Sequence, residues 1–237
     1  MRSLLILWFV FTFPLSIFSQ ELEKILEAHY KASAQDKLGK VETIVTSGKN
    51  SYAMADIGSS FRMFKGRPNK IRIEGEFQGS KVIQTYDGET GWMFAPAMGI
   101  PEPKEMKGEE LETILNQSDF GSPLWNYEEK GNSVELVGVS EDGSADHLKL
   151  TTAKNELNFY IDKESHLISS IRSIQVIGGA ETEIEVVLMN YKSVKGIPIA
   201  QQVVTKMNGE VVTTVDIERV EYNLKLDASL FEKPSSK

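Results

Sequence analysis

The residue types that most often carry chemistry are sparse and scattered in this sequence. The three histidines, His29, His147 and His166, lie far apart, and none has the H-x-x-x-H or H-E-x-x-H spacing of a zinc site. The adjacent pairs Glu109–Glu110 and Glu128–Glu129 would point apart on a helix or a strand. These residues therefore favour a solvated surface over a metal site or an acid–base centre.

Motifs for a nucleophile or a phosphate site are also missing from the sequence. The chain has no cysteine, which excludes a thiolate nucleophile, a disulfide and a thiolate metal site. It contains neither G-x-S-x-G nor G-x-x-x-x-G-K-[ST]. We expect no catalytic residue, no metal and no cofactor, although an enzyme assembled from scattered Asp, Glu and His side chains remains an alternative.

Composition points to a globular protein that avoids nucleic acid. The 237 residues are 41% hydrophobic and 25% charged, an ordinary balance for a packed domain. With 26 Lys and Arg against 34 Asp and Glu, the net charge is -8, and such a field repels polyanions. No composition shift or long linker divides the chain, which predicts a single domain.

The N-terminus has the pattern of a secretory signal peptide. Met1 and Arg2 precede a nearly unbroken apolar run over residues 4–18, and Ser19 offers a small residue for cleavage before Gln20. The alternative is a membrane anchor, but a span needs about 20 apolar residues. We expect residues 1–19 to be removed and residues 20–237 to be an exported, soluble, single domain in the periplasm.

Most of the chain has the period-two pattern of antiparallel strands. Lys70–Phe77 alternates charged and apolar residues, with Ile71, Ile73 and Phe77 on the dry side. Further strands are expected at residues 81–86, 91–95, 134–139, 147–152, 156–161, 168–177, 181–191, 199–206 and 211–222. Hairpin turns are predicted at Asp87-Gly88, Asp142-Gly143, Gly178-Gly179 and Asn208-Gly209.

Two regions have helical spacing instead. Residues 21–34 form an amphipathic pattern, and residues 106–115 place Leu111, Ile114 and Leu115 on one helical face. Three prolines between residues 96 and 103 argue against a regular strand there, and residues 96–130 are expected to hold one or two helices, the second around residues 124–127. The predicted fold is mainly β with α (α+β), a curved antiparallel half-barrel sheet covered by an N-terminal helix and a central helical insert.

A sheet of this size with few helices predicts an apolar cavity. A curved sheet must fill its concave face with side chains, helices or a ligand, and residues 92–101 add a run of large, soft apolar groups. That run could equally cap the core. The expected cavity-lining residues are Ile71, Ile73, Phe77, Trp92, Phe94, Met98, Leu111, Ile114 and Leu115.

Three ordered segments resemble the LolA-type carriers of outer-membrane lipoproteins. They are Gly66-Arg67-Pro68-Asn69-Lys70-Ile71-Arg72-Ile73, Thr85-Tyr86-Asp87-Gly88 and Gly91-Trp92-Met93-Phe94-Ala95-Pro96. The resemblance implies a half-open barrel that holds the acyl chains of a lipoprotein or a phospholipid while they cross the periplasm. It also implies an inner-membrane release complex and an outer-membrane acceptor as partners.

The resemblance assigns a role to one polar residue. Arg67 falls where the family has an arginine that bonds the lid at the cavity mouth, although it could also be a surface residue before a strand. Ile71 and Ile73 fall where the family has aromatic cavity residues, which is a departure. Because related folds also act as envelope sensors, the open alternatives are a carrier, a lipid- or protein-binding sensor, and an enzyme.

Overall fold

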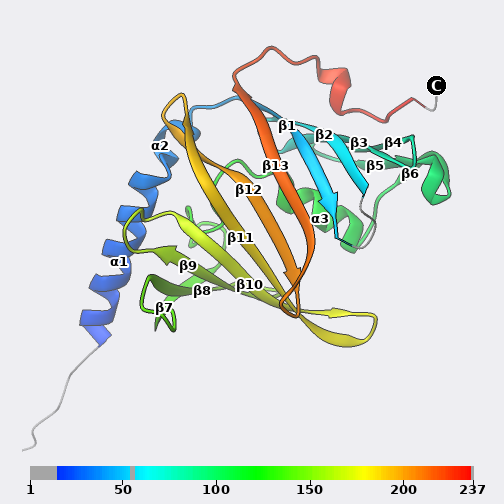
Figure 1. The fold of residues 1–237 in the computed structure, drawn as a ribbon. Coiled ribbons are helices and arrows are strands. Elements are labelled where there is room, and N and C mark those ends of the chain that lie inside the picture. Colours follow the sequence, from blue (N-terminus) through cyan, green and yellow to red (C-terminus); the bar gives the residue numbers. More distant parts are fainter. Residues whose placement is uncertain (1–14, 54–56, 236–237) are drawn as a thin grey trace, which may run out of the picture.

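The computed structural model describes residues 15–53 and 57–235 of the chain. Within these ranges, thirteen strands form one antiparallel sheet in the order β6-β5-β4-β3-β2-β1-β13-β12-β11-β10-β9-β8-β7. The sheet is twisted and curved, and it does not close into a barrel (Figure 1). The predicted mainly β fold with an N-terminal helix and a central helical insert is confirmed.

The bounds of the elements follow the chain. The first half contributes α1 (Leu15–Ala32), α2 (Gln35–Leu38), β1 (Thr43–Tyr52), β2 (Ile57–Gly66), β3 (Lys70–Phe77), β4 (Ser80–Tyr86), β5 (Gly91–Ala95), the 3-10 turn η1 (Pro96–Met98), β6 (Ile100–Glu105) and α3 (Glu109–Ser118). The second half contributes β7 (Ser133–Val139), β8 (Ala145–Thr151), β9 (Glu156–Asp162), β10 (Ile168–Ile177), β11 (Ala180–Val194), β12 (Ile197–Met207), β13 (Glu210–Tyr222) and the 3-10 turn η2 (Ala228–Phe231).

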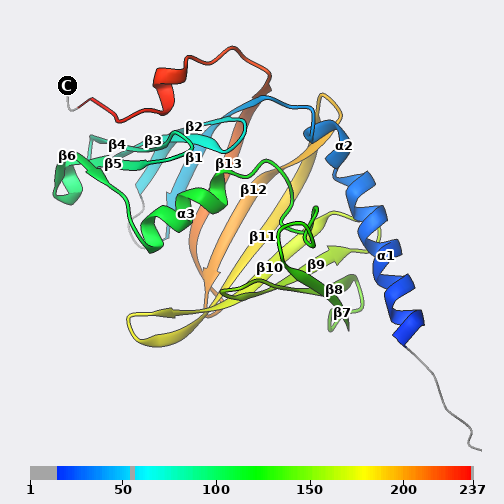
Figure 2. The same cartoon turned by 180° about the vertical axis from the view of Figure 1, so that it is seen from behind.

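The sheet consists of two meanders joined in the middle. Strands β1 to β6 follow one another along one half, β7 to β13 follow one another along the other, and β1 pairs with β13. The chain passes from edge strand β6 to edge strand β7 through residues 106–132, which include α3. Figure 2 shows α3 lying in front of the sheet. We call the face that α3 contacts the inner face.

Turn chemistry fixes the hairpins where the sequence predicts them. Asn208 and Gly209 have φ angles of 47° and 84°, the positive pair that a two-residue type I′ turn requires. They place Met207 opposite Glu210 in the β12–β13 register. In the β4–β5 connection, Asp87 Oδ1 accepts hydrogen bonds from two following backbone amides, both at 2.8 Å, which closes that turn.

One expectation for residues 96–130 is wrong, and of the one or two helices expected there the structure has one, α3. Residues 100–105 form strand β6 although Pro101 and Pro103 lie within it, because β6 is an edge strand that pairs with β5 alone among the described strands. Residues 124–127 form turns rather than a helix. Asn126 has a φ of 51° there, a left-handed conformation that a right-handed helix excludes.

Apolar packing holds the helices on the inner face. Leu26 of α1 packs with Leu148, Phe159 and Ile161 of β8 and β9, and Phe159 is fully buried. Each such side chain contributes about 1.5–3 kcal/mol on burial. On the opposite, outer face, Phe231 of η2 packs against β1 and β2, so the C-terminal segment covers a different side of the sheet from α3.

The predicted signal peptide lies mostly outside the described residues. Residues 1–14 are not described, and residues 15–19 form the first part of α1. Among the described residues, no helix is both long and apolar enough to cross a membrane.

Candidate functional site

Five of the predicted cavity residues meet in one packed cluster. Ile71 and Ile73 of β3 contact the apolar side of α3, together with Tyr86 and Met106; the α3 members are Leu111, Ile114 and Leu115. Ile71 is 0% exposed and Ile114 is 1% exposed. These two side chains are shielded from solvent, so α3 covers this part of the inner face as a lid.

Trp92 and Phe94 lie on the outer face. Met93 joins the inner cluster, and side chains alternate along a strand, so its two neighbours point the other way. The ammonium of Lys233, near the C-terminus, lies 4.5 Å from the centre of the Trp92 ring, and Phe94 is buried. The run of soft apolar residues is therefore divided between two surfaces, which its period-two pattern could have indicated.

Phe77 and Met98 are the most exposed of the predicted site residues. Phe77 ends β3 at the β3–β4 hairpin and is 42% exposed, and Met98 in η1 is 53% exposed. The cluster under α3 contains neither of them. Both lie at the periphery of the sheet, away from the packed lid.

Half-buried apolar side chains cross the middle of the inner face. They lie between the α3 cluster and the α1 cluster, and their cross-strand registers put them on the face of Met63 and Leu188. We call them the inner strip: Phe61, Val186, Leu188, Val203, Val215 and Ile217. A side chain in the centre of a sheet stays half exposed when no second layer covers it. The strip is therefore apolar surface that the described helices leave partly uncovered, with Leu188 at its edge packing against the α1 cluster.

Sequence reasoning missed the inner strip for an identifiable reason. Residues 186–189 are Val-Val-Leu-Met, so both faces of β11 are apolar and their alternation is hidden. The neighbouring strand has the same ambiguity at Val203 and Val204. Only the pairing of β1 with β13 shows which members of these runs share a face with β2.

Arg67, at the end of β2, is fastened to the segment between α2 and β1. Its Nε donates a hydrogen bond to the Val41 carbonyl at 2.8 Å, and its Nη2 donates to the Leu38 carbonyl at 3.1 Å. The guanidinium carbon lies 4.5 Å from the ring centre of Phe120, just beyond α3. One side chain thus links the N-terminal helices, the sheet and the C-terminal end of the lid.

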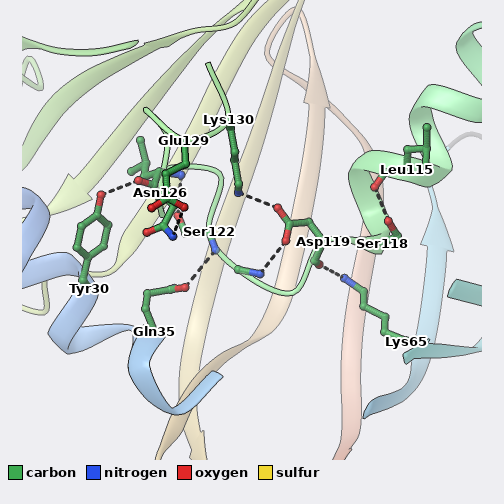
Figure 3. Close-up of polar contacts among 12 residues, drawn as sticks. Tyr30, Gln35, Lys65, Leu115, Ser118, Asp119, Ser122, Asn126, Glu129 and Lys130 are labelled. Carbon is green, nitrogen blue, oxygen red and sulfur yellow. Dashed lines mark hydrogen bonds and ion pairs between the residues drawn. The ribbon is translucent and has the colours of Figure 1, made fainter. Parts of the chain in front are cut away.

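Lys65 and Lys130 hold the same end of the lid from two other sides. Lys65 Nζ donates to the backbone carbonyl of Asp119 at 2.8 Å, and Lys130 Nζ lies 2.8 Å from an Asp119 carboxylate oxygen (Figure 3). Burial lowers the pKa of Lys65 to about 8, opposed by the charge of Asp119. Burial alone would raise the pKa of Asp119, but Lys130 and nearby backbone amides hold it below its usual value.

The segment after α3 also bonds to the N-terminal helices. The Tyr30 hydroxyl donates to the Leu124 carbonyl at 2.6 Å, and Gln35 Oε1 accepts from the Ser122 amide at 3.4 Å (Figure 3). Burial raises the pKa of Tyr30 to about 12, so the hydroxyl remains a donor at neutral pH.

We call residues 119–130, with the side chains that hold them, the clasp. Beside it is a hollow of about 320 Å³, lined by Gln35, Leu38, Gly39, Arg67, Asp119, Phe120, Gly121, Trp125, Asn126, Glu129 and Lys130.

The histidines do not form a reaction centre. His29 is buried and bonds the His166 carbonyl at 3.0 Å, and burial lowers its pKa. His147 stacks on Tyr160 on the outer face with ring centres 4.7 Å apart, beside a polar hollow of about 530 Å³. Among the described residues, no three His, Asp or Glu side chains are grouped so as to hold a metal ion.

Comparison with known proteins identifies the fold. No protein-family model matches the chain, and no curated protein matches it. Solved structures do match, and in three of them the alignment covers 87–89% of this chain and 96–97% of the other. They are a DUF1329 family protein from Desulfovibrio piger (15% identity, TM-score 0.59), a LolA superfamily protein from Nitrosomonas europaea (11%, 0.60) and an outer membrane lipoprotein-sorting protein domain from Vibrio parahaemolyticus (12%, 0.58). The chain has a LolA-like fold, as the sequence segments around Arg67 and Trp92 predict.

Proposed function

We propose that this protein is a periplasmic carrier that shields the acyl chains of a lipoprotein, or of a similar lipid, on the inner face of its sheet and moves them towards the outer membrane. The observation that carries the proposal is the inner strip, a group of half-buried apolar side chains in the centre of a large sheet. The LolA-like fold supports it, and so does the apolar run at residues 4–18.

The chemistry of the strip suits an acyl chain better than a polar substrate. Each buried methylene contributes about 0.8 kcal/mol, without directional bonds, so a long chain binds tightly and with little selectivity. In this proposal α3 is the lid, and Leu115, a partly buried member of the cluster under α3, moves with it to widen the apolar surface. Arg67 holds the lid closed through the clasp. No catalytic step, metal, cofactor or nucleic acid is required.

Release needs partners because the strip itself offers no chemistry for it. A ligand held by apolar contacts leaves when another apolar surface competes for it or when the lid closes. We therefore propose an inner-membrane release complex that loads the protein and an outer-membrane acceptor that unloads it. The second candidate function, an envelope sensor on the same scaffold, uses the same strip to bind a lipid or protein without delivering it.

Native mass spectrometry of the gently purified protein tests the proposal. We expect phospholipid or acylated peptide to remain bound to the wild type and to be lost from Ile217→Arg, which places a charge in the strip. Ile174→Arg is the matched control, because Ile174 is 60% exposed and points to the outer face.

Three results are informative. Wild-type protein that is free of lipid contradicts the proposal, and so does equal loss of lipid from both variants. Lipid that is bound but never passed from inner- to outer-membrane vesicles favours the sensor over the carrier.

A further inference from the structure

Lys65 places a positive charge on the inner face, separated from the inner strip by Met63 of the α3 cluster. It lies on the inner face of β2, with Ile44 of β1 and Ile71 of β3 as its cross-strand neighbours. Phe61, a member of the strip, is four residues earlier on the same face, a distance of about 13 Å along an extended strand. A cation thus borders apolar surface, in the arrangement that an amphipathic ligand requires.

The bond that Lys65 makes is to the movable part of the structure. In the described part of the chain, the only hydrogen bond of its ammonium is to the Asp119 carbonyl, at the C-terminal end of the lid. An ammonium carries three N–H donors, so two remain for other acceptors. If the lid shifts to admit a ligand, the third N–H donor is also released, because it loses the Asp119 carbonyl.

The surroundings of Lys65 carry an excess of positive charge. Arg67 and Lys130 approach the same segment, whereas Asp119 and Glu129 are the carboxylates there. Lys130 neutralises Asp119, and Glu129 accepts a hydrogen bond from Asn126. Although the chain as a whole is acidic, this corner of the inner face favours an anion.

We propose that Lys65 is the headgroup anchor of the ligand site, and that the preferred ligand is a lipid with an anionic head, a carboxylate or a phosphate, whose chain lies along the inner strip. The inference rests on the proposed carrier function. When the lid opens, Lys65 exchanges the neutral Asp119 carbonyl for the anion, and a charge-assisted hydrogen bond is the stronger of the two. A lipid with a neutral head leaves the ammonium without that partner. The free energy of binding is then less favourable, because the ammonium is half-buried.

Isothermal titration of the purified protein with three probes that share one hydrocarbon chain tests the proposal. The probes are oleate, oleoyl lysophosphatidic acid and oleyl alcohol, all below their micellar concentrations. We expect at least one anionic probe to bind about tenfold more tightly than the alcohol. Whichever anionic probe binds more tightly distinguishes a carboxylate from a phosphate head.

Variants assign the preference to Lys65. Lys65→Met should reduce the affinity for the preferred anionic probe about tenfold and leave the alcohol unchanged, whereas Lys65→Arg should keep the preference. Lys81→Met, which removes an exposed lysine from the outer face of β4, is the control for net charge. If Lys65→Met does not fold, Lys65→Gln supplies the neutral side chain.

The outcomes separate this inference from the proposed function. Binding of all three probes with equal affinity, or a preference that survives in Lys65→Met, overturns the role of Lys65 and leaves the carrier intact. If none of the three probes binds, the carrier proposal fails and the anchor fails with it.

Discussion

Replacing Arg67 by leucine removes three contacts at the clasp at once. The variant loses the hydrogen bonds to the carbonyls of Val41 (2.8 Å) and Leu38 (3.1 Å) and the stacking on Phe120 (4.5 Å). Hydrogen bonds from a charged donor contribute about 1.5–3 kcal/mol each, and a cation–π contact at an exposed site about 0.5–1 kcal/mol. Ordering the long side chain costs up to about 2 kcal/mol. We expect a net loss of about 2 kcal/mol in the free energy of unfolding.

Urea denaturation at pH 7 measures this loss. The midpoint should fall in Arg67→Leu while the slope stays the same. Arg67→Lys is the control, because it keeps the charge but lacks the planar fork that reaches two carbonyls, and it should be intermediate. A loss below about 0.5 kcal/mol in Arg67→Leu, the size of an ordinary surface substitution, would refute the energetic reasoning.

Hydrogen exchange and lipid uptake then test whether the contact is a gate. The amide of Val41 donates to the Leu38 carbonyl that Arg67 also uses, so exchange should accelerate at residues 38–41 and 118–121. The β8 and β9 strands should keep their protection. A fluorescent lipid probe should enter the variant faster than the wild type, and unchanged uptake and transfer would remove Arg67 from the mechanism.

Two further predictions concern stability. Gly48→Ala should lower the free energy of unfolding in urea by about 3 kcal/mol, because a Cβ there would overlap the backbone carbonyl of Asp216. Gly58→Ala, whose Cβ would meet one backbone oxygen at 3.6 Å, should be nearly neutral, and equal effects would contradict this steric argument. Burial holds the pKa of His29 below 6.5, so only the unfolded chain gains a proton there as the pH falls through 6.5, and the free energy of unfolding should decrease. His29→Gln should weaken this pH dependence in thermal unfolding between pH 7.5 and 5, and an unchanged slope would show that other groups cause it.

Local signals in the sequence were sufficient for most elements of the fold. Alternation identified β3 and the later strands, and Asn208-Gly209 identified the tightest turn, because these depend on residues a few positions apart. The pairing of β1 with β13 joins segments more than 150 residues apart, and no local pattern encodes it. Strand β6 was not predicted, because prolines indicate the absence of a strand unless the strand is known to lie at the edge of a sheet.

The candidate site was predictable where a helix and a strand each had one apolar side. Ile71 and Ile73 alternate with charged residues along β3, and the apolar residues of α3 recur at helical spacing, so their common burial follows from pattern alone. Trp92, Met93 and Phe94 are all large and apolar, so the sequence predicts one site for them. Because side chains alternate along the strand, Met93 lies on the inner face and its two neighbours lie on the outer face. Lys65 has no sequence signal as a site residue, because its role depends on the position of Asp119.

In the proposed mechanism, the lid and the ligand compete for the same kind of surface, and their free energies are of similar size. Three half-buried or buried side chains of α3 hold the lid on β3 and β4, and at the lower limit of about 1.5–3 kcal/mol each they contribute about 5 kcal/mol. Six or seven methylenes at about 0.8 kcal/mol each offset that amount, so a typical acyl chain is long enough to displace the lid and still bind with net affinity. The polar contacts of the clasp lie at the C-terminal end of α3 and not along its apolar side. Displacement is therefore a rotation of α3 about its C-terminal end, in which Lys65 exchanges the Asp119 carbonyl for the headgroup. Arg67 and Lys130 stay beside this end of the helix while the apolar strip opens to the chain.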